Sequence, residues 1–181
     1  MHVLVVYESM YGNTRVVADS IADGLRASHE ARVVPVAKAT GDLVTAADLL
    51  VVGGPTHLHG LSSASSRRMA AKAAAKPGSK QSLDPGASGP GLRDWLGGLG
   101  GRTALAAAFD TRFSGVPFFT GRASQGIARL LRRHGYRLVA APESFLVGQE
   151  NTLLDGESSR ARLWGVALAT AATDAYVPQH A

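Results

Sequence analysis

The pattern of apolar residues along the chain predicts strands that alternate with helices. Continuous apolar runs without alternation are typical of strands that are covered on both faces. Such runs occupy residues 2–7, 32–36, 48–53 and 103–109. A fifth strand is predicted to begin at 137–141, and the apolar residues 145–147 leave open whether it continues past Pro142 to Val147. Apolar residues at helical spacing, which predict helices with one buried side, occupy residues 16–27, 63–76, 92–99, 122–134 and 155–176.

Local signals define some of the ends of these elements. Ser62 or Ser63 suits the N-cap of the helix at 63–76, and Pro77-Gly78 predicts its end. Residues 78–91 and 110–121 lack an apolar period and are predicted to be loops. The buried stripe of the last helix is expected to consist of Leu163, Trp164, Ala167, Leu168 and Ala171.

Strands that alternate with helices predict an α/β fold with a parallel sheet and helices on both faces. Right-handed crossovers then favour a doubly wound, five-stranded sheet of order 2-1-3-4-5. At 181 residues, the chain is expected to form one domain over residues 1–181. Ligands of such sheets bind beyond the carboxyl ends of the strands, so the loops at 8–14, 54–61 and 110–122 are the places to search for a site.

The charge of the chain is concentrated in its middle. The net charge is +5, and it divides into −2 for residues 1–60, +10 for residues 61–140 and −3 for residues 141–181. In the predicted fold, the helices after the third and fourth strands would place the cations on one face, which could attract an acidic partner. These cations include Arg67, Arg68, Lys72, Lys76, Arg129, Arg132 and Arg133. The alternative is that they only solvate the outer sides of the helices.

Composition excludes several classes of function. Without cysteine there is no disulfide, thiolate metal site or cysteine nucleophile. The start of the chain does not resemble a signal peptide, and its apolar runs are too short to span a membrane, so a cytoplasmic location is expected. Neither a nucleic-acid motif nor a G-x-S-x-G elbow occurs.

Phosphate-binding chemistry follows the first predicted strand. Ser9, Met10, Tyr11, Gly12, Asn13 and Thr14 connect that strand to an amphipathic helix. Hydroxyl and amide groups, a glycine and the start of a helix together offer donors and a positive dipole end to an anion. The pattern is neither a Walker loop nor a G-x-G-x-x-G fingerprint. An ordinary strand-to-helix turn remains the alternative.

The segment Val5-Val6-Tyr7-Glu8-Ser9-Met10-Tyr11-Gly12-Asn13-Thr14 resembles the FMN-phosphate signature of flavodoxins, and the order of elements agrees over essentially the whole chain. The resemblance implies a flavodoxin-like fold, FMN as the cofactor, and residues 9–14 around its phosphate. The Ser-Met-Tyr-Gly form is also similar to the flavodoxin-like NAD(P)H:quinone oxidoreductases.

The resemblance implies further contacts from the other two loops. The isoalloxazine ring would be bordered by Pro55, Thr56, His57 and Leu58 from the second loop. From the third loop, Phe113 is a candidate contact to the flavin, and Asp110, Thr111 and Gly121 would contact the ring edge or the ribityl chain. The aromatic residues of the third loop offer a flat surface to the ring. His57 and His59 also form an H-x-H pair, but no third metal ligand lies nearby in the sequence, so no metal site is predicted.

These features predict a flavoprotein in electron transfer, either a carrier or a reductase of quinone-like acceptors, in which FMN supplies the chemistry. Its partners would be a redox protein or a small quinone-like acceptor, with NAD(P)H as a candidate donor and neither nucleic acid nor a membrane span involved. The alternative is a flavin-free module of the same fold that binds an acidic partner through its basic face. No residue is predicted to act as a catalytic acid or base.

Overall fold

The computed structural model describes residues 1–57, 60–79, 81–87, 89–115 and 121–176. In chain order its elements are β1 (His2–Tyr7), α1 (Asn13–Leu25), β2 (Glu30–Pro35), the 3-10 helix η1 (Val36–Lys38), α2 (Gly41–Ala46), β3 (Leu49–His57), β4 (Gly60–Leu61), α3 (Ala64–Ala74), α4 (Leu92–Gly97), β5 (Leu105–Phe113), α6 (Ala123–Arg133), β6 (Arg137–Leu138), β7 (Glu143–Val147) and α7 (Glu157–Ala175). The predicted alternation is confirmed, and the short helix α2 is an addition to it.

The sheet has the order β2-β1-β3-β5-β6, which confirms the predicted arrangement 2-1-3-4-5. The predicted fifth strand consists of two pieces, because both β6 and β7 pair in parallel with β5. Pro142 precedes the second piece and has no N–H to donate to a strand ladder. The two-residue strand β4 pairs with β3 in antiparallel orientation and completes the seven strands of the described sheet.

Two strands are longer than the apolar pattern predicted. β3 continues past Gly53 to His57, and β5 continues past Phe109 to Phe113. The extra residues are stabilised by pairing, since Pro55 lies opposite Thr111, and Thr111 lies opposite Phe145 of β7. The prediction that a loop begins at Asp110 was therefore wrong, and Asp110, Thr111 and Phe113 are strand residues.

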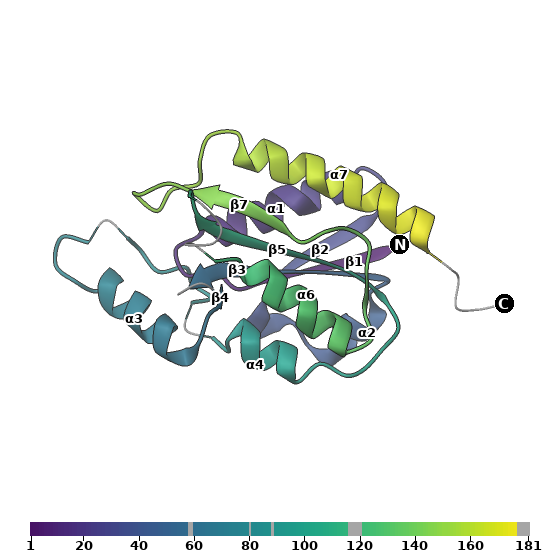
Figure 1. Ribbon diagram of the computed structural model, residues 1–181, viewed down its shortest axis with the longest axis horizontal. Coiled ribbons are helices and arrows are strands. Elements are labelled where there is room, and N and C mark those ends of the chain that lie inside the picture. Colours follow the sequence, from purple (N-terminus) through teal and green to yellow (C-terminus); the bar gives the residue numbers. More distant parts are fainter. Residues whose placement is uncertain (58–59, 80, 88, 116–120, 177–181) are drawn as a thin grey trace.

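Helices cover both faces of the sheet (Figure 1). α1 and α7 pack on one face, and α2, α4 and α6 pack on the other. On the first face, three aromatic rings from β5, β7 and α7 meet edge to face: Phe109 lies 6.3 Å from Phe145, which lies 6.0 Å from Trp164 between ring centroids. Among the described residues, no helix is both long enough and apolar enough to cross a membrane.

Two glycines allow α1 and α7 to approach each other closely. A Cβ atom added to Gly165 would lie 2.2 Å from the carbonyl oxygen of Ile21, and one added to Gly24 would lie 2.1 Å from that of Arg162. The side of α7 that carries its small residues is therefore the side that is buried. It consists of Ala161, Gly165, Leu168, Ala169 and Ala172.

The predicted stripe of α7 is confirmed at Leu168 and in part at Trp164, which packs against the core, and it is wrong at Leu163 and Ala167. Leu163 is 65% exposed, Ala167 is exposed, and Trp164 and Ala171 are half-buried. The larger apolar side chains were expected to face inward, whereas the close approach of α1 leaves room only for glycine and alanine at the centre of the crossing.

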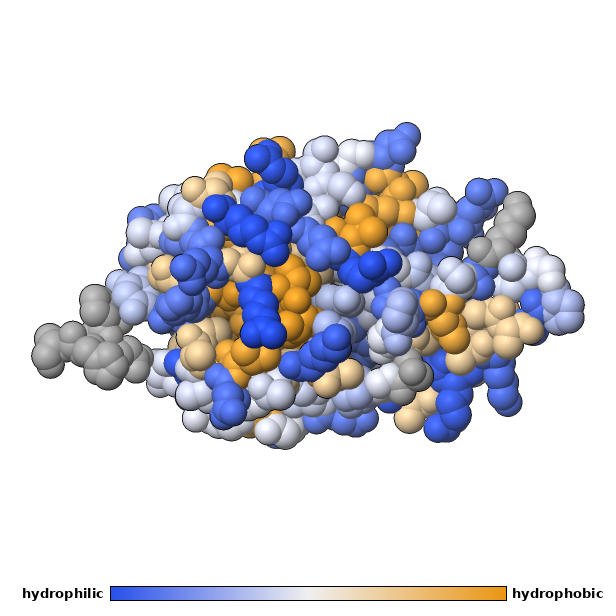
Figure 2. Space-filling view, turned by 180° about the vertical axis from the view of Figure 1, so that it is seen from behind, coloured by the Kyte–Doolittle hydropathy of each residue, from blue (hydrophilic) through white to orange (hydrophobic). Residues whose placement is uncertain are grey.

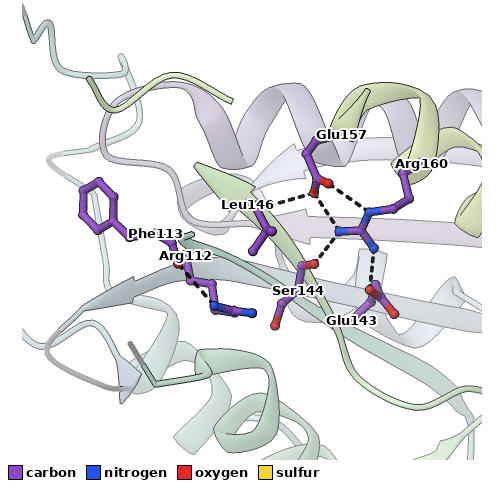
Figure 3. A network of polar contacts seen from close by, with 7 residues as sticks. All are labelled: Arg112, Phe113, Glu143, Ser144, Leu146, Glu157 and Arg160. Atoms are coloured by element: carbon purple, nitrogen blue, oxygen red, sulfur yellow. Dashed lines mark hydrogen bonds and ion pairs between the residues drawn. The ribbon is translucent and has the colours of Figure 1, made fainter. Parts of the chain in front are cut away.

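A polar network holds the start of α7 against β7 (Figure 3). Arg160 bonds the carboxylates of Glu157 and Glu143 and the carbonyl oxygen of Ser144, and its guanidinium lies 4.4 Å from the centre of the Phe145 ring. Glu157 also accepts a hydrogen bond of 2.7 Å from the backbone N–H of Leu146. Burial opposes ionisation of Glu157, yet these hydrogen bonds and the charge of Arg160 lower its pKa below the ordinary value.

Helix α3 does not lie against either face of the sheet. It stands beyond the end of the sheet, beside β4 (Figure 1), and packs through Ala70 against Met10 and Ala87. Its N-terminus is the predicted one: the Ser63 hydroxyl accepts from the backbone N–H of Ser66, and the Ser66 side chain reciprocates. The prediction of one basic face was therefore wrong for the cations of α3, which lie at the carboxyl end of the sheet.

Candidate functional site

The three loops singled out in the sequence meet at a pocket of about 580 Å³ at the carboxyl end of the sheet. This volume is within the usual range for a small-molecule or cofactor site. The lining residues come from the β1–α1 loop, β3, α3 and the segment after it, β5, β7 and the loop after β7. They are Met10, Tyr11, Asn13, Thr14, Pro55, Thr56, His57, Ser66, Met69, Ala70, Ala73, Gln81, Thr111, Arg112, Phe113, Val147 and Asn151.

The β1–α1 loop presents the start of a helix to this pocket. Gly12 is the N-cap of α1 with φ of 93°, a left-handed conformation that favours glycine, and its N–H donates to the Ser9 hydroxyl over 3.0 Å. No side chain of the described chain caps the first N–H groups of α1. An uncapped helix start beside a pocket suits an anion, because unpaired N–H groups and the positive dipole end point at the same place.

Hydrogen bonds hold this loop to neighbouring elements. The hydroxyls of Thr14 and Thr111 are 2.8 Å apart in a buried pair that joins α1 to β5. The side-chain amide of Asn13 donates to the carbonyl oxygen of Asn151 over 2.8 Å. The carbonyl oxygen of Met10 accepts from the N–H of Asp84 at 2.8 Å. The loop is thereby held before any ligand binds.

The second wall of the pocket is the end of β3. Pro55, Thr56 and His57 line it, and the Thr56 hydroxyl accepts from the N–H of Ala123, the first residue of α6, over 2.9 Å. Burial lowers the pKa of the His57 imidazole below its ordinary value, and the charge of Glu8 offsets part of this effect. The buried Nε2 of His57 has no hydrogen-bond partner within the described residues. Leu58 and His59 lie outside those residues, so the predicted contact of Leu58 and the H-x-H pair stay sequence predictions.

The end of β5 forms a third wall but separates the residues predicted there. Thr111 and Phe113 line the pocket, and Phe113 is 52% exposed. Asp110 is fully buried outside the lining and accepts from the N–H of Ser124, in the first turn of α6, over 2.7 Å. Burial raises the pKa of the Asp110 carboxyl, against this hydrogen bond. Gly121, with φ of 73°, is also outside the lining.

Glu8 is a buried acid beneath the site that the sequence prediction left unassigned. It is 5% exposed, and its carboxylate accepts from the Ser62 hydroxyl at 2.6 Å and from the N–H of Leu92 at 2.7 Å. These bonds connect the end of β1 to the segment before α3 and to the start of α4. By accepting these bonds, the Glu8 carboxylate holds the three chain segments next to one another beneath the pocket.

Helix α3 supplies the wall that the sequence prediction missed. Ser66, Met69, Ala70 and Ala73 recur at helical spacing along one side of α3 and line the pocket, and the Tyr11 hydroxyl donates to the carbonyl oxygen of Ala70 over 2.9 Å. The same spacing could have indicated that this side of α3 is covered, but it could not show which part of the chain covers it or that it lines a pocket. Arg112, Gln81, Val147 and Asn151 likewise gave no sequence signal.

The structure thus gathers most of the predicted contacts into one site. Nine of the predicted residues line the pocket: Met10, Tyr11, Asn13, Thr14, Pro55, Thr56, His57, Thr111 and Phe113. Ser9 and Gly12 shape the loop from beneath, and Asp110 and Gly121 stand outside the lining.

Comparison with known proteins decides the family. The sequence model of the flavodoxin family matches residues 5–164. The chain belongs to the flavodoxin family. Proteins of this family bind flavin, typically FMN, and take part in electron transfer. The matched span includes every loop that lines the pocket of this flavodoxin-family chain. No curated protein gave a significant match.

Solved flavodoxin structures share the fold along nearly the whole chain. An archaeal flavodoxin is 18% identical with a TM-score of 0.66, and the alignment covers 96% of this chain and 99% of that one. Oxidised flavodoxin 1 from Bacillus cereus is 17% identical with a TM-score of 0.63, covering 98% and 100%. A WrbA-like flavodoxin from Agrobacterium tumefaciens is 22% identical with a TM-score of 0.55, covering 96% and 98%. At these identities the likeness shows the fold.

Proposed function

We propose that this chain binds FMN in the pocket at the carboxyl end of its sheet and transfers electrons through it. The observation that carries the proposal is the uncapped start of α1, whose loop is held by Gly12, opening into a pocket of about 580 Å³ in a member of the flavodoxin family. When bound, FMN supplies the redox chemistry, and the protein supplies binding and orientation.

The residues present fit the parts of such a cofactor. The loop at 9–14 offers hydroxyl, amide and backbone N–H donors for a phosphate. Hydrogen bonds to a charged oxygen contribute about 1.5–3 kcal/mol each, more than the roughly 0.3–1 kcal/mol of the helix dipole, so no lysine is needed. His57 lines the pocket, and its buried Nε2 has no hydrogen-bond partner within the described residues, so we propose that it bonds a polar edge of the ring.

The apolar and aromatic side chains suit a flat ring. Pro55 from β3, Phe113 from β5 and Met69 from α3 line the pocket, and Phe113 and Met69 keep more than half of their surface exposed. A ring that covers an exposed aromatic or thioether side chain gains hydrophobic and π contacts. We propose that these three residues border the isoalloxazine ring, together with His57.

Asp110 supports the proposal indirectly. Because it is fully buried and bonds the first turn of α6, it shapes the third wall rather than meeting the ring. Its role in the proposal is to hold the end of β5 and the start of α6 in place.

Reconstitution tests the cofactor. The purified protein with any flavin removed should take up FMN in a 1:1 complex, seen as quenching of flavin fluorescence, and riboflavin should bind more weakly because it lacks the phosphate. A Thr14→Val variant should weaken FMN binding more than riboflavin binding, and Thr170→Val, on the exposed side of α7, is the matched control. If the folded protein takes up no FMN, the proposal is wrong.

A second form of the same function is a reductase of quinone-like acceptors with NAD(P)H as donor. The Ser9-Met10-Tyr11-Gly12 form of the phosphate loop favours it. Steady consumption of NAD(P)H by the FMN-loaded protein with a benzoquinone would assign the reductase form. Rapid exchange of electrons with redox proteins, without such turnover, would assign the carrier form.

A further inference from the structure

A stripe of exposed cations lies beside the pocket on α3 and just after it. Arg68, Lys72 and Lys76 recur every four residues and all are exposed. Lys72 follows Met69 by three residues, so it lies one turn from a residue that lines the pocket, whereas Arg68 is two residues from both Ser66 and Ala70 and lies on the outer side of α3. The sequence from Leu61 to Leu83 contains no acidic residue. The charge of this stripe is therefore not neutralised from within its own segment.

The same surface has an exposed apolar centre. Met69 is 60% exposed and Phe113 is 52% exposed, and both line the pocket. Figure 2 shows hydrophobic and strongly hydrophilic groups side by side at the end of the molecule that carries α3. Exposed methionine and aromatic residues beside cations are typical of protein interfaces, where an apolar centre is surrounded by a polar rim.

Helix α3 is held so that this stripe faces outward. Its other side is bound by the Tyr11–Ala70 hydrogen bond and by Arg67, whose guanidinium donates to the carbonyl oxygen of Gly89 over 2.6 Å. The first acid after the stripe, Asp84, is buried and paired with Arg15 at 2.9 Å. An exposed acid, Glu150, adjoins the pocket on the loop after β7.

The second basic helix lies differently. Arg129, Arg132 and Arg133 are exposed on α6, which starts at the pocket with Ala123 and runs away from it. With a rise of 1.5 Å per residue, Arg132 lies about 14 Å farther along the helix than Ala123. α6 carries three exposed arginines, whereas α3 carries Arg68 and Lys72, and Lys76 follows two residues beyond its end. Of these cations, Lys72 lies one helical turn from Met69, which lines the pocket.

We propose that the α3 surface, formed by Arg68, Lys72 and Lys76 around Met69 and Phe113, docks an acidic redox partner protein that exchanges electrons with the bound FMN. The inference rests on the proposed function. Opposite charges accelerate encounter and orient the partner. Because electron transfer slows steeply with distance, a productive partner must approach at the pocket mouth, where Lys72 lies one helical turn from the lining residue Met69.

A binding experiment tests the surface without the cofactor. Decaglutamate, as a probe for an acidic polypeptide, is titrated into the isotope-labelled protein at about 150 mM salt, where the Debye length is about 8 Å, and backbone amide shifts locate its contacts. Wild type should show shifts in α3 and near Phe113. Replacing Arg68, Lys72 and Lys76 together by Gln should weaken binding about tenfold. The matched variant with Gln at 129, 132 and 133 should stay within about twofold of wild type.

A kinetic experiment tests electron exchange with the FMN-loaded protein. After two-electron reduction, the flavin is oxidised in stopped flow by ferricyanide, each ion taking one electron and leaving as ferrocyanide, or by the cationic tris(phenanthroline)cobalt(III). The α3 variant should react about tenfold more slowly with ferricyanide and faster with the cobalt complex. The α6 variant should match wild type within about twofold.

The outcomes separate this inference from the proposed function. Peptide shifts centred on α6, or equal losses in the two variants, overturn the inference while leaving FMN binding intact. A protein that takes up no FMN overturns the proposed function, and then the docking of a redox partner falls with it, even where the peptide binds α3. If the triple variant fails to fold by circular dichroism, Lys72→Gln alone decides the peptide experiment.

Discussion

Replacement of Gly165 by alanine tests the close contact between α1 and α7. In an exposed helix interior this change adds helix propensity of up to about 1 kcal/mol. Here the new Cβ atom would lie 2.2 Å from the carbonyl oxygen of Ile21, which is backbone and cannot rotate away. Reaching even 3.0 Å, the lower limit for real Cβ contacts, requires the helices to move apart by about 0.8 Å, and an ordinary contact at 3.4 Å requires about 1.2 Å.

Such movement disturbs the whole packed face. Overpacking of a well-packed core costs about 1–3 kcal/mol, and helix propensity offsets up to about 1 kcal/mol of this. We therefore expect the free energy of unfolding of Gly165→Ala to fall by about 0.5–2 kcal/mol. For a domain of this size, that corresponds to a decrease in Tm of about 1–8 °C.

Two other helical glycines provide graded controls. A Cβ atom at Gly126 would lie 3.3 Å from the end of the flexible Leu61 side chain, and one at Gly97 meets no atom of the described residues within 4 Å. Urea unfolding followed by circular dichroism should rank Gly97→Ala as neutral or stabilising, Gly126→Ala near zero and Gly165→Ala as destabilising. If Gly165→Ala proves as stable as Gly97→Ala, the close crossing of α1 and α7 is refuted.

Three further predictions concern the polar groups. Thr14→Val and Thr111→Val should each lower the free energy of unfolding by about 1–3 kcal/mol, because each leaves the other buried hydroxyl unpaired. The double variant should lose less than the sum, because it leaves no buried hydroxyl unpaired. Denaturant unfolding of wild type, the two single variants and the double variant checks this coupling. The Glu157 carboxylate has a lowered pKa, so it stabilises the fold above its ordinary pKa of 4.5 and loses that effect as pH falls through the folded value. Glu157→Gln should therefore unfold more easily at neutral pH and show a shallower acid limb, and a parallel shift at all pH values would contradict this. Burial lowers the pKa of the His57 imidazole, so the folded state binds a proton at this residue less readily than the unfolded state does. The free energy of unfolding should therefore fall as pH decreases from 6.5, the ordinary pKa of histidine, towards the lower pKa of His57 in the folded protein. His57→Gln should lose this component in a pH series of thermal melts, and an unchanged slope between wild type and variant would count against it.

The apolar pattern predicted the sheet well because buried parallel strands need continuous apolar runs. It failed where pairing replaces burial as the cause of strand structure: the ends of β3 and β5 contain Gly54-Pro55 and Asp110-Thr111, which extend because they face each other across the sheet. It also failed on α7, where Leu163 is exposed because the crossing with α1 admits only small residues. The local pattern of apolar residues does not predict which distant segments of the chain contact each other.

The part of the site that could be predicted is the part whose residues are contiguous in the sequence. Residues 9–14 were predicted to form a ligand-binding loop because strand, glycine and helix start are contiguous, and Met10, Tyr11, Asn13 and Thr14 line the pocket. Their binding of a phosphate stays a prediction. Asp110 was expected at the ring edge or the ribityl chain, but it lies outside the pocket lining and accepts from the N–H of Ser124 at the start of α6. The α3 wall and the buried Glu8 depend on how residues 60–92 fold back over the loop, and no local signal encodes that path.

Because α3 is separate from the sheet, this wall of the pocket can open at a lower free energy than the rest of the protein. Of the eleven residues of α3 only Ser66 and Ala70 are buried, whereas seven of the thirteen residues of α1 are buried. Segments with little buried apolar surface open locally at a free energy below that of global unfolding. Amide hydrogens of α3 should therefore exchange faster than those of α1, and a bound cofactor should leave by local opening of this helix. The hydrogen bonds from Tyr11 to Ala70 and from Arg67 to Gly89 should then govern the residence time of the proposed FMN, while the sheet remains folded.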